Sequence, residues 1–288
     1  MNKCNLLRKR LSEPDIILSP GVYDCLSAKI AERTGFEVIF TSGFGISGSV
    51  LGYPDYGFLT ATEMLNAVGN ISKSVDIPLI ADIDTGYGNP LNVVRTIKEV
   101  IKLGIAGVIL EDQEWPKRCG HLEGKRIISM EEHVEKIRAA RFASGESGLV
   151  IVARTDAREE LGLEEAIRRG KAYYEAGADV IFIEAPKTEE ELREIPSALP
   201  DVPLLANMIE GGKTPCLSVR DLEKLGYKLG VFTLSGLFAA TKAIEECFRF
   251  LKENGTISGF ENTSSFQDYK EIINIKKYQE LEEKFKGS

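Results

Sequence analysis

The sequence predicts a (β/α)8 barrel, in which eight parallel strands close into a cylinder that helices surround. Short apolar runs rich in Ile and Val alternate with helical patterns along the chain, as in parallel sheets that are covered on both faces. Eight such units occur in 288 residues, a length that suits a single barrel. Polar side chains gather where the expected strands end, as they do at the mouth of a barrel.

The apolar runs define the expected strands. In chain order they cover residues 16–19, 38–42, 78–84, 107–113, 149–156, 180–184, 203–207 and 228–235. Glycines stand just before four of these runs, where a helix that ends in a left-handed conformation favours glycine. They are Gly35, Gly104, Gly177 and Gly226.

Two helix starts are visible as capping patterns. Asn89 precedes Pro90, which places a capping side chain before a proline in the first turn. Thr188 and Glu191 have the spacing of a capping box. A further helix is expected over residues 130–142, and His133 is interpreted as a solvated residue on its exposed side.

The chain is expected to form one domain, residues 1–288, with a helical tail from about residue 253. Within that tail the pattern predicts a helix over residues 266–285. Two connections, 43–60 and 114–129, are long for a compact barrel, and long loops of this kind are usually lids or binding loops.

Composition excludes several classes of partner. The formal net charge of −8 argues against binding to nucleic acid or to a membrane surface. No run of about 18 apolar residues occurs, so no membrane span is expected. The five cysteines are scattered without a C-x-x-C pair, which is typical of reduced thiols in a cytoplasmic protein.

Polar side chains lie at or near the carboxyl ends of seven of the eight expected strands. They are Ser42, Asp82, Asp84, Glu111, Gln113, Arg154, Asp156, Glu184, Asn207, Thr233 and Ser235. Polar residues can simply mark the ends of strands, but carboxylates, amides and an arginine at seven ends favour a catalytic site at one barrel mouth.

The carboxylates suggest a metal site. Asp82 and Asp84 are two residues apart on one expected strand and therefore share a face, and Glu111 follows the neighbouring strand. Carboxylate oxygens and water are the ligands that Mg²⁺ prefers. The alternative is that these side chains cap helices or form ion pairs, since buried charge needs compensation of some kind.

The segment 111–121 carries the least common feature of the chain, a thiol between two cations and a Gly-His pair. The Lys117, Arg118 and His121 neighbours bias the Cys119 thiol toward the thiolate, or at least toward easy proton exchange. Cys119 could act as a nucleophile with His121 as its base, as a general acid, or as a buried packing residue. Its place beside the acidic cluster favours the general acid.

Other strand-end residues have roles that suit a carboxylate substrate. Arg154 can hold a carboxylate through a bidentate fork. Asn207 and Ser42 can add neutral hydrogen bonds, and Glu184 can orient Arg154 or a water molecule.

Five motifs together resemble one enzyme family. They are residues 82–86 (DIDTG), 111–113 (EDQ), 117–121 (KRCGH), 153–156 (ARTD) and Asn207. In this order they are similar to the isocitrate lyase/phosphoenolpyruvate mutase superfamily, over about residues 16–255. The run that contains Cys119 resembles its carbon–carbon lyase branch, because mutases and phosphonopyruvate hydrolases lack that cysteine.

The resemblance implies a Mg²⁺ enzyme in which Mn²⁺ can substitute. It implies metal contacts from Asp82 and Asp84, with Asp55 and Glu111 acting through water. It implies catalytic roles for Cys119, Arg118, His121, Arg154 and Glu184, and substrate contacts from Ser42, Gly43, Phe44, Gly120, Arg154 and Asn207. It also implies a homotetramer of helix-swapped pairs.

The resemblance also narrows the reaction to cleavage of a 2-hydroxy-2-alkyl dicarboxylate, with 2,3-dimethylmalate giving pyruvate and propanoate. Lyases of this branch that act on the tricarboxylate 2-methylisocitrate place an arginine where Phe238 stands, and glycine where Phe44 stands. Cleavage of 2-methylisocitrate, decarboxylation of oxaloacetate and a non-catalytic metabolite-binding barrel remain as alternatives. The base that removes the hydroxyl proton is left open between a carboxylate and Tyr23.

Overall fold

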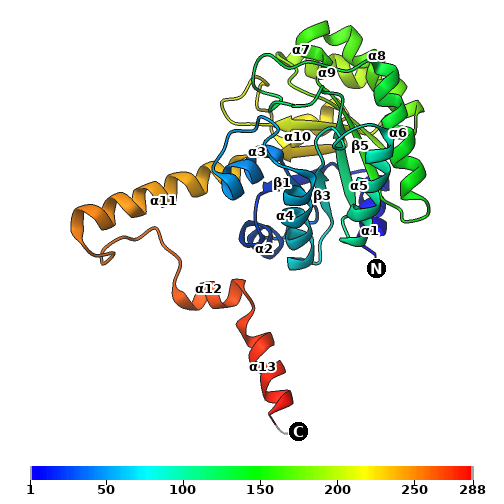
Figure 1. Cartoon of the computed structure of the whole chain (residues 1–288). Coiled ribbons are helices and arrows are strands. Elements are labelled where there is room, and N and C mark those ends of the chain that lie inside the picture. Colours follow the sequence, from blue (N-terminus) through cyan, green and yellow to red (C-terminus); the bar gives the residue numbers. More distant parts are fainter. Residues whose placement is uncertain (1, 287–288) are drawn as a thin grey trace.

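The computed structural model describes residues 2–286 and shows a closed barrel of eight parallel strands (Figure 1). Each strand pairs with its neighbour in sequence, and the last pairs with the first. The predicted fold class is therefore confirmed. The strands are β1 (Ile17–Val22), β2 (Ile39–Thr41), β3 (Leu79–Asp82), β4 (Gly107–Glu111), β5 (Val150–Thr155), β6 (Val180–Ile183), β7 (Leu204–Met208) and β8 (Leu229–Phe232).

Helices follow the strands, and most of them pack around the outside of the barrel. They are α1 (Lys3–Ser12), α2 (Cys25–Arg33), α3 (Gly43–Ile46), the π-helix η1 (Ser47–Leu51), α4 (Ala61–Ser74), α5 (Pro90–Lys102), α6 (Met130–Ser144), α7 (Ala157–Leu161), α8 (Leu163–Glu175), α9 (Glu189–Ala198), α10 (Val219–Leu225), α11 (Ser235–Asn254), α12 (Phe266–Ile272) and α13 (Ile275–Phe285). Asn89 caps α5 with Pro90 in its first turn, as predicted. The Thr188 side chain accepts from the N–H of Glu191, but the Glu191 carboxylate accepts from the N–H of Lys187, so only half of the predicted capping box forms.

The barrel interior is filled by apolar side chains from the strands and from α1. Leu7 of α1 is fully buried and packs in the same cluster as Ile17, Phe40 and Ile80. Helix α1 thereby closes the amino-terminal end of the barrel. The sequence analysis did not anticipate this helix, whose apolar positions are few and flanked by basic residues.

The predicted glycine positions are confirmed. Gly35, Gly104, Gly177 and Gly226 all have positive φ, from +71° to +109°. Each lies at the end of a helix, where the chain reverses toward the next strand. A side chain would strain the backbone at these positions.

The two long connections differ in structure. The first contains α3 and η1, and its Ser47 hydroxyl donates to the carbonyl of Tyr53 at 2.9 Å. The second, residues 114–129, has no helix, and an antiparallel bridge pairs Gln113 with Ile127 at its base. We call residues 114–129 the thiol loop because it carries Cys119.

The interpretation of His133 as a surface residue was wrong. Helix α6 extends to Ser144, and His133 lies on its inner face with no exposed area. Its ring packs edge-on against Tyr173 of α8, with 4.6 Å between centroids. Burial lowers the pKa of His133 to about 3, with the charges of Lys136 and Arg169 acting in the same direction.

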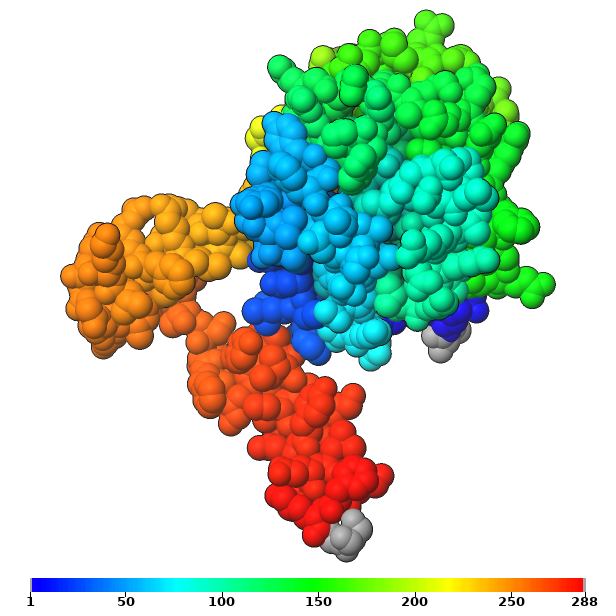
Figure 2. All heavy atoms as spheres, viewed as in Figure 1, coloured from blue at the N-terminus to red at the C-terminus, as the bar shows by residue number. Residues whose placement is uncertain are grey.

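The tail leaves the barrel. Helix α11 projects outward from the end of β8, α12 returns to lie against α2, and α13 extends away from the barrel (Figures 1 and 2). Arg33 of α2 forms an ion pair with Glu271 of α12 at 3.0 Å. The predicted helix 266–285 is two helices, because Asn274 adopts a left-handed conformation with φ of +54°. Among the helices of residues 2–286 we find none with the length and hydrophobicity of a membrane span.

Candidate active site

A cavity opens at the carboxyl ends of the strands. Its lining residues are Phe40, Ser42, Gly43, Phe44, Asp55, Asp82, Cys119, Gly120, His121, Arg154, Phe182, Glu184, Asn207, Ile209, Thr233 and Leu234. Eleven of the residues that the sequence analysis proposed for the site are in this set. Asp84 and Glu111 lie next to it and are almost completely buried. Arg118 does not line the cavity.

Two aspartates follow strand β3 at the floor of the cavity. The carboxylate of Asp82 accepts hydrogen bonds from the N–H of Gly43 at 2.9 Å and from the N–H of Asp84 at 3.0 Å. Asp84 lies 2.7 Å from Nζ of Lys117, which also lies 2.9 Å from Asp55. Burial raises the pKa of Asp84 to about 6, although the charge of Lys117 opposes this.

Lys117 supplies charge compensation that the sequence analysis did not assign. Its side chain is only 3% exposed. Burial disfavours its charge, but the surrounding carboxylates, Asp84 first, raise the pKa of Lys117 well above its ordinary value. Within residues 2–286 no three acidic, thiol or imidazole side chains surround one point as metal ligands, and the cation between Asp55 and Asp84 is this ammonium group.

The surroundings of Glu111 bear on whether the acidic cluster can hold a metal ion. Glu111 has no exposed area, and neither of its carboxylate oxygens accepts a hydrogen bond. The nearest cation is Arg154, with Nε 3.4 Å from the carboxylate. Burial raises the pKa of Glu111 well above its ordinary value. A buried carboxylate without donors is costly unless a cation compensates it, and carboxylate oxygens such as those of Glu111 are the ligand type that a hard divalent cation prefers.

Arg154 is the central cation of the site. Its Nε and NH2 groups donate to Asp156 at 2.8 and 2.9 Å, and NH1 lies 3.2 Å from Glu184. The bidentate fork that was predicted for a substrate carboxylate is therefore made with Asp156. A guanidinium group has five N–H donors, so its NH1 and NH2 end can still serve a ligand in the cavity.

The surroundings of Cys119 favour the neutral thiol rather than the thiolate that its basic sequence neighbours suggested. Burial raises the pKa of Cys119 to about 11, and the charge of Asp55 acts in the same direction. The basic side chains next to Cys119 in the sequence do not point toward its thiol. Lys117 is paired with the aspartates, and the Arg118 guanidinium donates to the carbonyl of Glu123 at 2.9 Å.

The side chain of Arg118 lies away from the cavity, and its catalytic role stays a prediction. Its guanidinium lies 5.3 Å from the ring centroid of Tyr56, on the outer side of the thiol loop. Its backbone has a separate role, because the N–H and C=O of Arg118 both bond to the side-chain amide of Gln113, at 2.9 and 2.8 Å. These bonds fix the start of the loop.

Gly120 allows the thiol loop to approach the barrel. A Cβ atom at this position would lie 2.4 Å from NH2 of Arg154 and 2.6 Å from Cγ of Glu184. The loop therefore rests directly on these two side chains, and glycine is required for close approach. Gly43 is restricted in the same way, with Nζ of Lys117 only 2.8 Å from the position of a Cβ.

Glu184 and His121 form a pair at the edge of the cavity. Nε2 of His121 lies 3.1 Å from Glu184, and Nδ1 accepts a hydrogen bond from the backbone N–H of Lys213 at 3.0 Å. Burial acts to raise the pKa of Glu184, but the charge of Arg154 outweighs it and holds this pKa below its ordinary value. Glu184 is therefore anionic and faces both Arg154 and His121.

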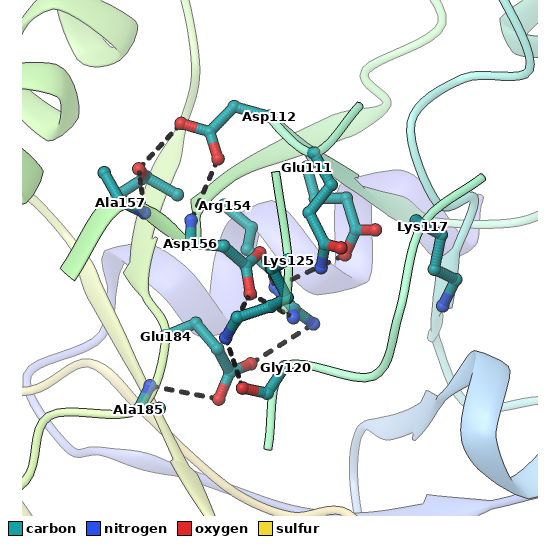
Figure 3. A network of polar contacts seen from close by, with 12 residues as sticks. Glu111, Asp112, Lys117, Gly120, Lys125, Arg154, Asp156, Ala157, Glu184 and Ala185 are labelled. Carbon is teal, nitrogen blue, oxygen red and sulfur yellow. Dashed lines mark hydrogen bonds and ion pairs between the residues drawn. The ribbon is translucent and has the colours of Figure 1, made fainter. Parts of the chain in front are cut away.

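A second layer of polar residues supports the site. Asp112 has no exposed area, and its carboxylate accepts from the N–H of Asp156 at 2.9 Å and from Thr155, Arg169 and Tyr173 at 2.7 to 2.9 Å. Figure 3 shows Asp112 above Asp156, on the side away from Gly120 and Glu184. The sequence analysis assigned Asp112 no role, although its position in the 111–113 motif was a signal.

Of the two phenylalanines that the sequence analysis placed near the substrate, Phe44 and Phe238, only one lines the cavity. Phe44 lines the cavity, with Phe40 and Phe182. Phe238 is outside the lining and is 42% exposed on the first turn of α11. Tyr23, a candidate base, is also outside the lining, and burial raises its pKa, so a carboxylate suits the role of base better.

Comparison with known proteins identifies the family. Residues 7–252 match the family described as phosphoenolpyruvate phosphomutase. The chain is 42% identical to 2,3-dimethylmalate lyase of Eubacterium barkeri, over 99% of both chains. It is also 42% identical to 2-methylisocitrate lyase of Bacillus subtilis (strain 168), over 96% of this chain and 89% of the relative.

Solved structures of the same superfamily superimpose on the whole chain. Oxaloacetate acetylhydrolase in complex with 3,3-difluorooxalacetate has a TM-score of 0.95 at 34% identity, covering 100% of this chain and 98% of the other. Phosphonopyruvate hydrolase in complex with oxalate and Mg²⁺ has a TM-score of 0.90 at 31% identity, with 99% of both chains covered. The chain therefore belongs to the phosphoenolpyruvate mutase/isocitrate lyase superfamily, and it is a carbon–carbon lyase.

Proposed function

We propose that this protein is a Mg²⁺-dependent lyase that cleaves 2-hydroxy-2-alkyl dicarboxylates, with 2,3-dimethylmalate as its substrate and pyruvate and propanoate as products. The observation that carries the proposal is the composition of the cavity. Within the described chain, Arg154 is the only Lys or Arg among the lining residues, and Phe40, Phe44 and Phe182 supply apolar surface. Such a pocket suits two carboxylates and alkyl groups better than three carboxylates.

Asp82 and Asp84 would hold the metal ion, with Asp55 and Glu111 contacting it through water. When bound, Mg²⁺ or Mn²⁺ would neutralise one substrate carboxylate and lower the pKa of the substrate's 2-hydroxyl group. The unpartnered oxygens of Glu111 support this assignment. The complex of phosphonopyruvate hydrolase with oxalate and Mg²⁺ supports the choice of metal.

The protein's own residues account for the remaining steps. Arg154 binds the second carboxylate through its NH1 and NH2 end, and Ser42, Gly43, Gly120 and Asn207 surround the substrate. A carboxylate of the acidic cluster takes the hydroxyl proton. The C2–C3 bond breaks, its electron pair passes to C3, and C2 becomes the carbonyl carbon of pyruvate.

Cys119 completes the reaction by giving its proton to C3, which forms propanoate. A neutral thiol in the closed cavity suits this role, because a general acid must carry its proton before the transition state. The apolar walls keep water from competing for the carbanion. A decarboxylase acting on oxaloacetate would not need this thiol.

The experiment compares substrates under identical Mg²⁺: 2,3-dimethylmalate, other 2-alkylmalates, 2-methylisocitrate and oxaloacetate. An unpaired third carboxylate in a closed site costs a few kcal/mol, so 2,3-dimethylmalate should exceed 2-methylisocitrate in kcat/KM by roughly a hundredfold. Phe44→Gly should reduce this ratio by making space. A preference for 2-methylisocitrate or oxaloacetate in the unmodified enzyme would overturn the assignment.

We also propose that four copies assemble as helix-swapped pairs. Helix α11 follows the last barrel strand yet has no buried residue, and it exposes Phe238, Ile244, Phe248 and Leu251 by 42 to 65%. Exposed apolar surface of this kind marks an interaction site. Light scattering should give four times the mass of one chain, and a monomer at micromolar concentration would contradict the assembly.

A further inference from the structure

Lys125 is the most completely enclosed cation of the thiol loop. Its side chain has no exposed area. Nζ donates to the carbonyl of Gly120 and lies 3.2 Å from Asp156 (Figure 3). It also lies 2.9 Å from Glu159. One ammonium group therefore joins the residue next to Cys119 to the barrel end of β5 and to α7.

These contacts belong to a closed ring of polar groups around the thiol loop. The ring passes in order through Lys125, Asp156, Arg154, Glu184, His121, Lys213 and Glu159, and returns to Lys125. Lys213 enters twice, since its N–H bonds to His121 and its ammonium group to Glu159. Two members come from the thiol loop, and the others come from four different parts of the barrel mouth.

Through this ring, the position of the thiol loop depends on charged side chains at the mouth of the barrel. A buried ammonium group is stable only when carboxylates and carbonyls surround it. Lys125 meets that condition only where Asp156 and Glu159 stand, and Asp156 is held in turn by Arg154 at 2.8 Å. The same position brings the carbonyl of Gly120 to the ammonium group and leaves Cys119 at the cavity wall.

We propose that Lys125 is a positioning residue, which holds the thiol loop closed and places Cys119 over the substrate bound at Arg154. This inference rests on the proposed function, because Cys119 is the proton donor of that reaction. Lys125 itself is outside the cavity lining and does not touch the substrate. Glu159, 14% exposed in its side chain, is the outer anchor of the same contact.

The test uses Lys125→Met, which keeps length and removes the charge, in the full chain with Mg²⁺. The matched control is Arg126→Met, because Arg126 is the next residue and forms an exposed ion pair with Glu114 at 3.0 Å. Two readouts are measured: kcat and KM for 2,3-dimethylmalate, and the rate at which iodoacetamide alkylates Cys119, located by peptide mass spectrometry.

In Lys125→Met, kcat should fall roughly 10²-fold, the effect of a displacement of about 1 Å of a reacting group. KM should change less, since Arg154 keeps its bonds to Asp156. Alkylation of Cys119 should become several-fold faster because the loop opens. Arg126→Met should match the unmodified protein in both readouts.

Unchanged alkylation and unchanged kcat in folded Lys125→Met would overturn the inference. If Lys125→Met does not fold, Glu159→Gln gives the same test, since it weakens the contacts to Lys125 and Lys213 at a partly exposed position. Alkylation does not depend on the substrate. If it rises while the unmodified protein cleaves no 2-hydroxy dicarboxylate, the loop-holding role is supported and the proposed function is wrong.

Discussion

The backbone N–H of Lys213 donates to Nδ1 of His121 at 3.0 Å. A neutral imidazole ring has one protonated nitrogen, and a nitrogen that accepts a hydrogen bond is the unprotonated one. The proton of a neutral His121 is therefore on Nε2, the atom that lies 3.1 Å from Glu184. The loop after β7 thus selects the tautomer of a residue in the thiol loop.

His121→Gln should be less harmful than His121→Ala. Glutamine can present an amide N–H to Glu184, whereas alanine leaves that carboxylate without one of its donors. A hydrogen bond to a charged group contributes about 1.5–3 kcal/mol, so His121→Ala should lose roughly ten- to a hundredfold in kcat/KM. Steady-state kinetics of both variants check the order, and equal losses would show that the donor to Glu184 has no role.

Cys119→Ser should abolish most turnover without changing the fold. A serine hydroxyl has almost the same size, but it gives up a proton far less readily than the thiol. General acids contribute about 10²–10⁴-fold to rate, and a loss of that size is expected in kcat. The affinity for Mg²⁺, measured by calorimetry, is the control and should not change. A near-normal kcat would favour decarboxylation over C–C cleavage of a malate.

Asp84→Ala should remove the dependence of activity on divalent cations together with most of the activity. It should also release Lys117, whose Nζ would keep Asp55 as its partner. The variant is expected to remain folded, because Asp55 still compensates the buried charge of Lys117. Turnover measured across a Mg²⁺ titration checks this. Wild-type turnover at limiting Mg²⁺ would rule out Asp84 as a ligand.

His133 should make the protein less stable in mild acid. Its pKa is lowered to about 3 in the folded state by burial first and then by Lys136 and Arg169, while an unfolded histidine titrates near 6.5. Between these values the unfolded chain binds the extra proton, so stability falls as pH falls. The loss between pH 7 and pH 5 is about 2 kcal/mol from this group.

Urea unfolding at pH 7 and pH 5 measures this effect against His133→Phe. Both ring nitrogens of His133 lack side-chain hydrogen bonds, so phenylalanine can keep the packing on Tyr173. The variant should lose less stability than the unmodified protein over this pH range. An identical pH dependence in both proteins would assign the acid sensitivity to other groups.

The strands and the cavity could be predicted because both follow from short-range patterns. Apolar runs define strands such as β4, and Glu111 at its end must point into the mouth of any barrel built from them. The positions of long side chains could not be predicted in this way. Lys117, Arg118 and Lys125 are equally basic in sequence, yet two are buried against carboxylates and one turns to the surface, since only the folded loop decides which carboxylates each can reach.

Helix patterns failed where polar residues face inward. Helix α6 carries His133 and Lys136 on its buried side, so its polar sequence suggests a solvated surface. The network of Asp112, Arg169 and Tyr173 satisfies polar groups from several elements at once, and no local pattern reveals a partner 57 residues away. The break at Asn274 was missed for another reason, because asparagine tolerates a left-handed conformation without interrupting the apolar spacing.

The position of Leu7 determines the route by which substrate and products can pass. Because it seals the amino-terminal end of the barrel, the cavity communicates with solvent through the mouth beneath the thiol loop. For the proposed reaction, pyruvate and propanoate must leave through the same mouth by which the substrate entered. Product release then requires this mouth to open, a kind of step that limits turnover in many enzymes with mobile loops over the site.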